Sequence, residues 1–386
     1  MTRAWDAIAG EAVRRALACV DRPAYTVLPG GAALPQVPGP AVVAGMLERL
    51  EVEPGHRVLE IGTGSGFSAA VLSRLVGAGG HVTSIDIDAR LTGRAARLLA
   101  DDGCRNVRLV TGDGTRWAPT APAAGDQERG PSGAGDSGRG VSGAGDQRSG
   151  PSGADDQRRR RSGAGYDRVI AWVTPVRVPD VWVRQSAPGA VIVTPVHLAP
   201  LARAMAVVRL RRGAGPDRLA ADLLMPGGFA EARPEPPGQW PVPSYGVDAL
   251  TRDAAGRMWW VAAEWLRAHE PAVGMRLLEL MITDGRGGTG WPGAADLHAY
   301  LLAARPEGLT TAALGDQGWG IGCSDPGGVA LAGASGDLFV AGTSAAAERL
   351  DRWALEWRER GRPGMADLMP RLHRRGSGWD VRAAAP

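Results

Sequence analysis

The stretch from residue 57 to 70, RVLEIGTGSGFSAA, contains the residues best suited to bind a nucleotide-like cofactor. An acidic residue, Glu60, is followed by three glycines at alternate positions, Gly62, Gly64 and Gly66. A strand that ends in a tight glycine turn and continues into a helix presents backbone N–H groups and the positive end of the helix to a ligand. The spacing differs from the G-x-G-x-x-G pattern of classical dinucleotide sites.

Two further acidic residues occur where a cofactor site of this kind needs them. Asp86 ends the next predicted strand, about twenty residues after the last glycine, where a carboxylate binds both ribose hydroxyls. Asp113 lies in the Gly-Asp-Gly sequence that ends the third predicted strand, where an acid and a small residue accommodate an adenine edge. The same elements suit NAD, and tight turns need glycine in any case. Together, however, Glu60, the glycines and the two aspartates favour S-adenosylmethionine.

The elements that must position these residues alternate between strand and helix. Short apolar runs alternate with helical patterns from residue 57 to 115, and the strand pattern resumes at 166–173 and 190–196. This alternation is typical of a parallel, doubly wound sheet. Beyond residue 197, the runs AMAVVRLRR and RLAADLLM predict a terminal antiparallel strand pair. The fold class is therefore predicted to be α/β.

The composition of the chain predicts two domains. A decapeptide repeat at residues 124–163, rich in Gly, Ser, Asp and Arg, interrupts the first domain, and we expect it to be disordered because it has almost nothing to bury. A proline-rich linker at 236–247 ends the domain formed by residues 1–235. Residues 248–386 then form an accessory domain that we expect to contact the substrate.

Within the accessory domain, the sequence predicts two helices with strands between them. Helical patterns cover residues 249–269 and 345–361, and turn-separated strands are expected between 318 and 342. Leu350, Trp353 and Trp357 form a stripe at helical spacing, which is typical of a buried core.

Composition also limits the classes of partner and site. All 44 basic residues are arginines, and they are nearly balanced by 41 acidic residues, so we expect no nucleic-acid partner. The three cysteines and six histidines show neither disulfide nor metal spacing, so no metal is expected. The N-terminus does not resemble a signal peptide, and no run of about 18 uncharged apolar residues could span a membrane. We therefore expect a cytoplasmic protein; its oligomeric state is left open.

Several motifs in order resemble those of one enzyme family. The segments VLEIGTGSGFSAAVLSRLV, VTSID, NVRLVTGDGT, YDRVI and VRQSAPGAVIVTPV are similar to those of protein L-isoaspartate (D-aspartate) O-methyltransferases, and the resemblance covers roughly residues 20 to 235. It implies a seven-stranded Rossmann-like class I methyltransferase sheet, here with a smaller α+β C-terminal domain. It also implies S-adenosylmethionine as cofactor and a peptide or protein substrate that is methylated on an aspartate or isoaspartate carboxylate.

The resemblance assigns roles to particular residues. Because a carboxylate is ionised at neutral pH, the enzyme needs mainly to hold the reacting atoms in line, and no general base is required. No catalytic residue is therefore assigned, and Pro38, Gly39 and Thr174 are candidates for positioning the acceptor. Carried over to this sequence, the cofactor-binding set is Gly62, Thr63, Gly64, Ser65 and Gly66 at the methionine end, Glu60 in support, Asp86 at the ribose, and Asp113 with Gly114 at the adenine.

The acceptor side departs from the family pattern. Where the family has a serine or threonine hydroxyl that touches the substrate, this chain has Pro38, which offers no donor and fixes the backbone. After the fourth strand, the bulky Trp172 stands where the family tends to small residues, and it either faces the substrate or fills a gap at the sheet edge. The adjacent Val173 is a candidate for substrate contact. His197, just past a strand, is a further candidate for substrate contact.

The C-terminal region resembles the ends of long actinobacterial relatives that accompany lanthipeptide or ATP-grasp peptide pathways. The resemblance rests on the segment WALEWRERGRPGMADLMPRLHRRGSGWDVR. It implies an aspartate acceptor in a ribosomally made peptide, whose methyl ester is attacked by the next backbone nitrogen to give an aspartimide and methanol. Two alternatives remain: general repair of isoaspartate in proteins, and a non-catalytic adaptor that keeps only the fold.

Overall fold

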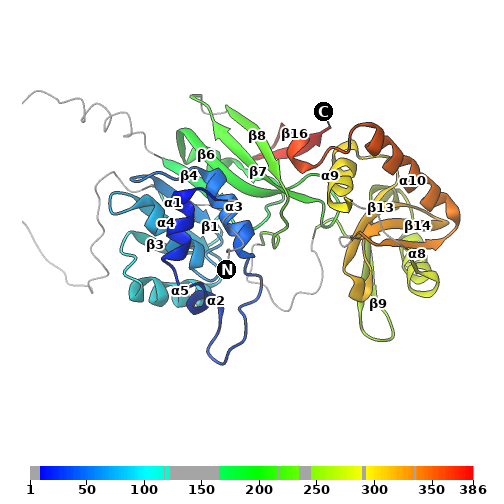
Figure 1. Cartoon of the computed structure of the whole chain (residues 1–386), viewed down its shortest axis with the longest axis horizontal. Coiled ribbons are helices and arrows are strands. Elements are labelled where there is room, and N and C mark those ends of the chain that lie inside the picture. The colour runs from blue at the N-terminus through cyan, green and yellow to red at the C-terminus, as the bar shows by residue number, and fades with distance from the viewer. Residues whose placement is uncertain are drawn as a thin grey trace, which may run out of the picture.

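The computed structural model describes residues 9–116, 118–121, 165–215, 218–233, 245–288, 293–333 and 336–385. The predicted repeat at 124–163 and most of the predicted linker at 236–247 lie outside these residues. Figure 1 shows the described chain as two lobes, each built on its own sheet. Each of these two sheets has seven strands.

The N-terminal sheet has the order β3-β2-β1-β4-β6-β7-β8. Its first five strands are parallel, whereas β7 and β8 are added in antiparallel fashion. The predicted α/β fold class, with its terminal antiparallel pair, is thus confirmed. The strands are β1 (Arg57–Ile61), β2 (His81–Asp86), β3 (Val107–Thr111), β4 (Tyr166–Ala171), β6 (Ser186–His197), β7 (Met205–Arg212) and β8 (Leu219–Met225).

Strand β1, the third strand of this sheet, is buried on both faces. All five residues of β1 are buried, as expected for a parallel strand covered on both sides. Its neighbouring residues Val58 and Leu59 belong to different core clusters, because successive side chains of a strand point to opposite faces. The helices of this lobe are α1 (Glu11–Ala18), α2 (Arg22–Thr26), α3 (Pro40–Leu50), α4 (Phe67–Val76), α5 (Ala89–Asp101) and α7 (Asp180–Arg184).

The C-terminal sheet is antiparallel, with the order β11-β15-β14-β13-β12-β10-β9. One face packs on α8, and the other packs on α9 and α10, so this lobe has the predicted α+β character. Its elements are β9 (Ala249–Arg252), β10 (Met258–Ala263), α8 (Pro271–Asp284), β11 (Arg286–Gly288), α9 (Ala294–Ala304), β12 (Leu309–Ala313), β13 (Trp319–Asp325), β14 (Gly328–Gly333), β15 (Leu338–Gly342) and α10 (Ser344–Glu359).

The helix predicted over residues 249–269 is wrong. This segment forms the hairpin β9–β10 and a short 3-10 helix at Glu264–Ala268. The turn is closed by Asp253, whose Oδ1 accepts hydrogen bonds from the N–H groups of Ala255 and Arg257. Trp259 and Trp260 are buried in clusters on opposite faces of the sheet, so tertiary packing outweighs the helical propensity of the alanines.

The other elements predicted in this region are confirmed. Strands β13, β14 and β15 occupy the segment between residues 318 and 342, and α10 covers most of 345–361. Leu350, Trp353 and Trp357 are buried in the core, as their helical spacing predicted.

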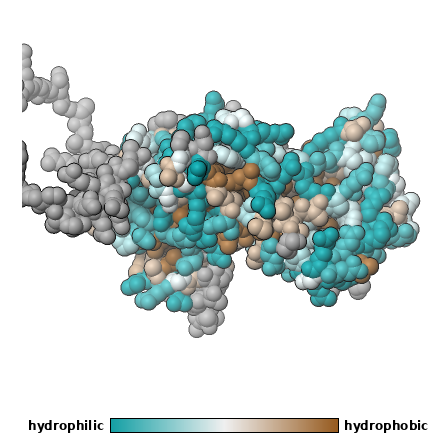
Figure 2. Space-filling view, turned by 90° about the horizontal axis from the view of Figure 1, so that it is seen from above, coloured by the Kyte–Doolittle hydropathy of each residue, from teal (hydrophilic) through white to brown (hydrophobic). Residues whose placement is uncertain are grey.

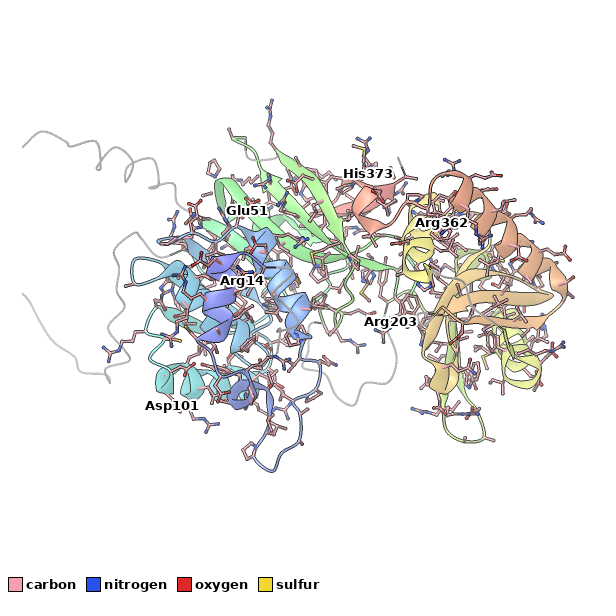
Figure 3. The ribbon with its side chains drawn as sticks, in the orientation of Figure 1. Arg14, Glu51, Asp101, Arg203, Arg362 and His373 are labelled. Carbon is pink, nitrogen blue, oxygen red and sulfur yellow. The ribbon has the colours of Figure 1, made fainter. Side chains whose placement is uncertain are left out.

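A C-terminal hairpin joins the two lobes. Strands β16 (Met369–Arg375) and β17 (Gly378–Ala384) pair with each other, and β17 also pairs with β5 (Val178–Pro179) of the N-terminal lobe. The hairpin lies beside β8, and Figure 3 labels His373 on it. The predicted domain boundaries stay a prediction. The structure adds that the last two strands, β16 and β17, pack on the N-terminal lobe.

The lobes also share a hydrophobic core. One cluster of buried residues runs from Trp182 and Leu198 in the N-terminal lobe to Trp260 and Leu297 in the C-terminal lobe. Thr311 donates a hydrogen bond across the junction to the carbonyl oxygen of Ala202, at 2.7 Å. Figure 2 shows a mostly hydrophilic surface with hydrophobic patches near the middle of the long axis. Among the described residues, no helix is long and apolar enough to cross a membrane.

Candidate active site

A cavity of about 750 Å³ lies at the carboxyl ends of the parallel strands. Its lining includes Ile61, Asp86 and Gly112, which end or follow β1, β2 and β3, and Trp172, which follows β4. Ligands of open α/β sheets bind outside the carboxyl ends of the strands, and this volume is in the range of small-molecule sites. The cavity is therefore the candidate active site.

The glycine loop forms one side of the cavity, and its backbone requires glycine. Gly62, Gly64 and Gly66 have φ angles of +90°, +51° and +84°. A Cβ atom at Gly66 would lie 2.9 Å from the Cβ of Ala95 on α5, so α5 packs directly against the loop. Helix α4 begins at the next residue, Phe67, with its N-terminal end at the loop.

Glu60 lies fully buried beneath the loop and does not line the cavity. Its Oε1 accepts hydrogen bonds from Ser68 Oγ (2.5 Å) and Trp172 Nε1 (2.8 Å), and its Oε2 accepts one from Ser84 Oγ (2.6 Å). Burial raises the pKa of Glu60 to about 7, although these three hydrogen bonds act in the opposite direction. Glu60 therefore ties together β1, β2, α4 and the segment after β4.

Asp86 faces the cavity from the end of β2. Its Oδ2 accepts a hydrogen bond from the N–H of Gly64 at 2.8 Å, and its Oδ1 accepts one from the N–H of Asp88 at 3.0 Å. Burial raises the pKa of Asp86, and the two backbone hydrogen bonds oppose that effect. The carboxylate thus links the glycine loop to the start of α5.

Asp113 and Gly114 form the part of the lining that follows β3. The Oδ1 atom of Asp113 accepts hydrogen bonds from the N–H and the hydroxyl of Thr115, at 2.9 and 2.6 Å. A Cβ atom at Gly114 would lie 2.9 Å from Ile61 Cδ1, so a larger residue would not fit without a shift. The carbonyl of Gly114 accepts a hydrogen bond from Trp182 Nε1 at 2.7 Å, which fixes this turn on α7.

The lining of the cavity also includes a short segment after β8, from Ala230 to Arg233. Two backbone hydrogen bonds hold it to Thr174: the N–H of Thr174 donates to Ala230 O (2.7 Å), and Thr174 O accepts from the N–H of Ala232 (2.8 Å). Thr174 and Glu231 thus form a parallel backbone bridge. The segment from Ala230 to Arg233 therefore runs alongside Thr174 and extends the wall of the cavity.

The structure brings most of the predicted site residues to one cavity. The predicted residues that line it are Pro38, Gly62, Thr63, Gly64, Ser65, Asp86, Asp113, Gly114, Trp172 and Val173. The predicted residues that do not line it are Gly39, Glu60, Gly66, Thr174 and His197.

Three of the residues outside the lining have other contacts. Gly39 precedes α3, and the hydroxyl of Thr174 contacts Met205 Sδ at 3.3 Å. His197 ends β6 and stacks on Tyr245, with ring centroids 3.9 Å apart. Burial lowers the pKa of His197 to about 4, so the imidazole is neutral at pH 7.

Several residues of the site were not predicted from the sequence. Ser68 and Ser84 donate to Glu60, while Glu231 and Arg233 line the cavity. The serines could have been noticed because each lies on an element next to the glycine loop. Nothing in the sequence separated Glu231 and Arg233 from the proline-rich stretch that follows them. Within the described ranges, no group of three or more His, Cys, Asp or Glu residues could hold a metal ion.

Comparison with known proteins shows that this chain is similar to protein-L-isoaspartate O-methyltransferases. Residues 7–124 match the family model of protein-L-isoaspartate(D-aspartate) O-methyltransferase. A protein-L-isoaspartate O-methyltransferase of Ignicoccus hospitalis (strain KIN4/I) is 31% identical over 175 residues, which cover 45% of this chain and 63% of the relative. Protein-L-isoaspartate O-methyltransferase 1 of Rhodopseudomonas palustris (strain HaA2) is 48% identical over 84 residues, covering 22% of this chain and 33% of that protein.

A solved structure of a protein-L-isoaspartate O-methyltransferase aligns over 97% of this chain and 95% of its own, with 16% identity and a TM-score of 0.43. The chain spans between a third and two thirds of the length of the two curated relatives described above.

Proposed function

We propose that this chain, whose residues 7–124 match the family model of protein-L-isoaspartate(D-aspartate) O-methyltransferase, is an S-adenosylmethionine-dependent carboxyl O-methyltransferase. The observation that carries the proposal is that the glycine loop, Asp86 and Asp113 all line the same cavity. We assign the acceptor to a peptide or protein that carries an aspartate or isoaspartate carboxylate.

The residues present fit the cofactor. Gly62, Gly64 and their neighbours Thr63 and Ser65 are assigned to its methionine end, with Gly66 and Glu60 holding the loop from behind. Asp86 is assigned to the ribose, because its carboxylate faces the cavity at the end of β2. Asp113 and Gly114 are assigned to the adenine, because both line the cavity after β3 and the close approach of Ile61 leaves no room for a side chain at Gly114.

For this reaction, these residues need to hold and orient the cofactor and the acceptor carboxylate, and they do not need to transfer protons. The cofactor supplies a methyl group on a sulfonium, and an acceptor carboxylate oxygen forms the new O–C bond as the C–S bond breaks, leaving a methyl ester and S-adenosylhomocysteine. The acceptor is already ionised at neutral pH, so alignment provides most of the rate enhancement. Trp172 and Val173 are assigned to the acceptor side, and the indole of Trp172 is held by Glu60.

The preferred acceptor that we propose is an aspartate in a ribosomally made, modified peptide, whose ester then closes to an aspartimide. Pro38 supports this choice, because it lines the cavity where the repair enzymes use a hydroxyl, and a proline ring donates no hydrogen bond to an isoaspartyl residue. General repair of isoaspartate is the second candidate, and it is favoured by the names of the similar curated proteins.

Mass spectrometry with two acceptors distinguishes these candidates. The protein is incubated with S-adenosylmethionine and either a generic isoaspartyl peptide or any modified precursor peptide encoded beside its gene. Peptide maturation predicts one added methyl group on the precursor alone, followed by loss of methanol. Methylation of the isoaspartyl peptide alone would replace maturation by repair. An adaptor would methylate neither, and it would show no calorimetric binding of S-adenosylmethionine.

A further inference from the structure

Gln36 is a polar residue of the cavity lining whose carboxamide is not engaged by the described part of the protein. The residue is exposed, and its side chain forms no hydrogen bond with any described residue. A glutamine side chain offers two N–H donors and a carbonyl acceptor. Gln36 therefore has donors that a ligand in the cavity can use.

The other polar side chains of the lining are engaged within the protein. Thr63 Oγ1 lies 2.6 Å from Ser84 Oγ, and Ser65 Oγ accepts a hydrogen bond from the N–H of Phe67 at 3.2 Å. The charged residues of the lining pair with one another or with backbone groups. Three more side chains each donate a hydrogen bond to a carboxylate: Ser68, Thr115 and Trp172.

The backbone holds Gln36 in a conformation that residues with a side chain rarely adopt. Its φ angle is +60°, in the left-handed region that is unfavourable for L-residues other than glycine. The chain is anchored on both sides: the N–H of Leu34 donates to Thr26 O at 2.8 Å, and Arg22 Nη2 donates to Pro38 O at 3.1 Å. A strained conformation persists only where the surroundings impose it, and such positions cluster at ligand sites.

The segment around Gln36 gives a ligand few other donors. Its other residues in the lining are apolar, and two of them are prolines without an N–H: Leu34, Pro35, Val37 and Pro38. Gln36 lies two positions before Pro38, which stands where the family resemblance implies a hydroxyl that touches the substrate. A carboxylate that leaves water for such a surface needs hydrogen-bond donors, and the Gln36 amide can provide them.

We propose that the Gln36 carboxamide donates a hydrogen bond to the acceptor carboxylate, in place of the hydroxyl that Pro38 lacks. The inference rests on the proposed function, because that function brings a carboxylate into this cavity. Gln36 Nε2 holds one carboxylate oxygen, which leaves the other oxygen free to face the methyl group. A hydrogen bond to an ionised acceptor is stronger than one between neutral groups, so an uncharged amide is sufficient for this role.

The variants separate the side chain of Gln36 from its backbone. Gln36→Gly removes the carboxamide and keeps the conformation, because glycine adopts a positive φ without strain. Urea unfolding should therefore show no loss of stability in this variant. Ala32→Gly is the matched control, because Ala32 is exposed in the same loop, does not line the cavity and has no positive φ. Gln36→Glu keeps the shape of the side chain but replaces its donors by a negative charge.

Calorimetry in the presence of S-adenosylhomocysteine measures peptide binding to these proteins. An aspartyl peptide is compared with its asparaginyl counterpart, and an isoaspartyl peptide with its α-carboxamide. For at least one pair, the wild-type protein should bind the carboxylate more tightly. Gln36→Gly should weaken that binding on the order of tenfold, which is typical of a lost hydrogen bond to a charged group, and Ala32→Gly should not. Gln36→Glu should reverse the preference, because its carboxylate repels the acceptor and accepts from an amide.

The inference is overturned by a wild type without carboxylate preference, by unchanged carboxylate binding in Gln36→Gly, by an equal loss in Ala32→Gly, or by an unreversed preference in Gln36→Glu. Gln36→Gly should also bind S-adenosylhomocysteine as the wild type does; a loss of about tenfold would assign Gln36 to the cofactor instead. Methyl transfer is scored separately. A wild type that prefers carboxylates through Gln36 but methylates neither peptide would refute the proposed function and leave this inference standing.

Discussion

At the scale of single residues, Glu60 is the most informative side chain of the site. It is fully buried, Ser68, Ser84 and Trp172 all donate hydrogen bonds to it, and burial still raises its pKa to about 7. Burying a carboxylate costs folding free energy, which indicates that Glu60 is present because it holds the glycine loop above it in place. Its link to Trp172 joins the cofactor side of the cavity to the acceptor side.

The raised pKa of Glu60 predicts a definite pH dependence of stability. Because the pKa of about 7 in the folded state exceeds the ordinary glutamate pKa of 4.5, the folded state binds more protons between these pH values. The contribution of Glu60 is therefore most favourable below pH 4.5 and is lost as the pH rises through 7. At about 1.4 kcal/mol per pH unit, the difference amounts to at most about 3.5 kcal/mol.

Urea unfolding of Glu60→Gln at pH 5 and pH 8 checks this prediction. The variant should gain in stability relative to the wild type at the higher pH, because it lacks the titrating group. Glu51→Gln is the control: the hydrogen bond from Arg211 lowers the pKa of Glu51, so its contribution is lost only below its ordinary pKa of 4.5, and the difference from the wild type should be the same at pH 5 and pH 8. Figure 3 labels Glu51 near the strands of the N-terminal sheet. An unchanged pH profile in Glu60→Gln would contradict the assignment.

At the scale of elements, the glycine loop and α5 act as one unit. Gly66 combines a φ of +84° with a Cβ position 2.9 Å from Ala95. Gly66→Ala should cost at least about 2 kcal/mol, because an L-residue is strained there and α5 would have to move. Gly93→Ala on the same helix meets no atom within 4 Å and has no positive φ, so it should stabilise the protein by up to about 1 kcal/mol.

Denaturant unfolding and calorimetry with S-adenosylhomocysteine measure both variants. The ligand affinity should fall in Gly66→Ala and stay unchanged in Gly93→Ala. Equal ligand affinities in the two variants would mean that the loop conformation does not shape the ligand site.

The elements also show what the sequence could and could not predict. Strands β1 to β4 and the glycine turn follow from local patterns, because apolar periodicity and backbone conformation are properties of neighbouring residues. The hairpin β9–β10 was mistaken for a helix, since its alanines favour helix while the burial of Trp259 and Trp260 depends on distant strands. The wall that carries Glu231 and Arg233 was missed because only its bridge to Thr174 brings it to the cavity.

At the scale of the whole molecule, the two lobes share one core. The cluster that contains Trp182 also contains Trp260 and Trp357, and the C-terminal hairpin pairs with β5. Arg177 pairs with Asp380 at 2.8 Å across this contact, which adds an ion pair to the junction. We therefore expect the lobes to unfold together.

Differential scanning calorimetry tests this expectation. The protein should show one cooperative transition. Trp357→Ala should lower the temperature of this whole transition, because removing a buried tryptophan side chain costs about 3–5 kcal/mol of stability. The control Leu355→Ala, at a residue that is 52% exposed on the same helix, should change the transition little. Two separate transitions, with only one lowered by Trp357→Ala, would show that the lobes are energetically independent.

The most direct measurement of the central claim follows the methyl group itself. The protein is incubated with S-adenosylmethionine labelled in its methyl carbon and with each of the two acceptor peptides, and the products are treated with mild base. Carboxyl methylation predicts label on an acceptor that base releases as methanol, and no label with Gly66→Ala. Label that resists base would indicate transfer to nitrogen, and the absence of label from both acceptors despite cofactor binding would contradict the proposed activity.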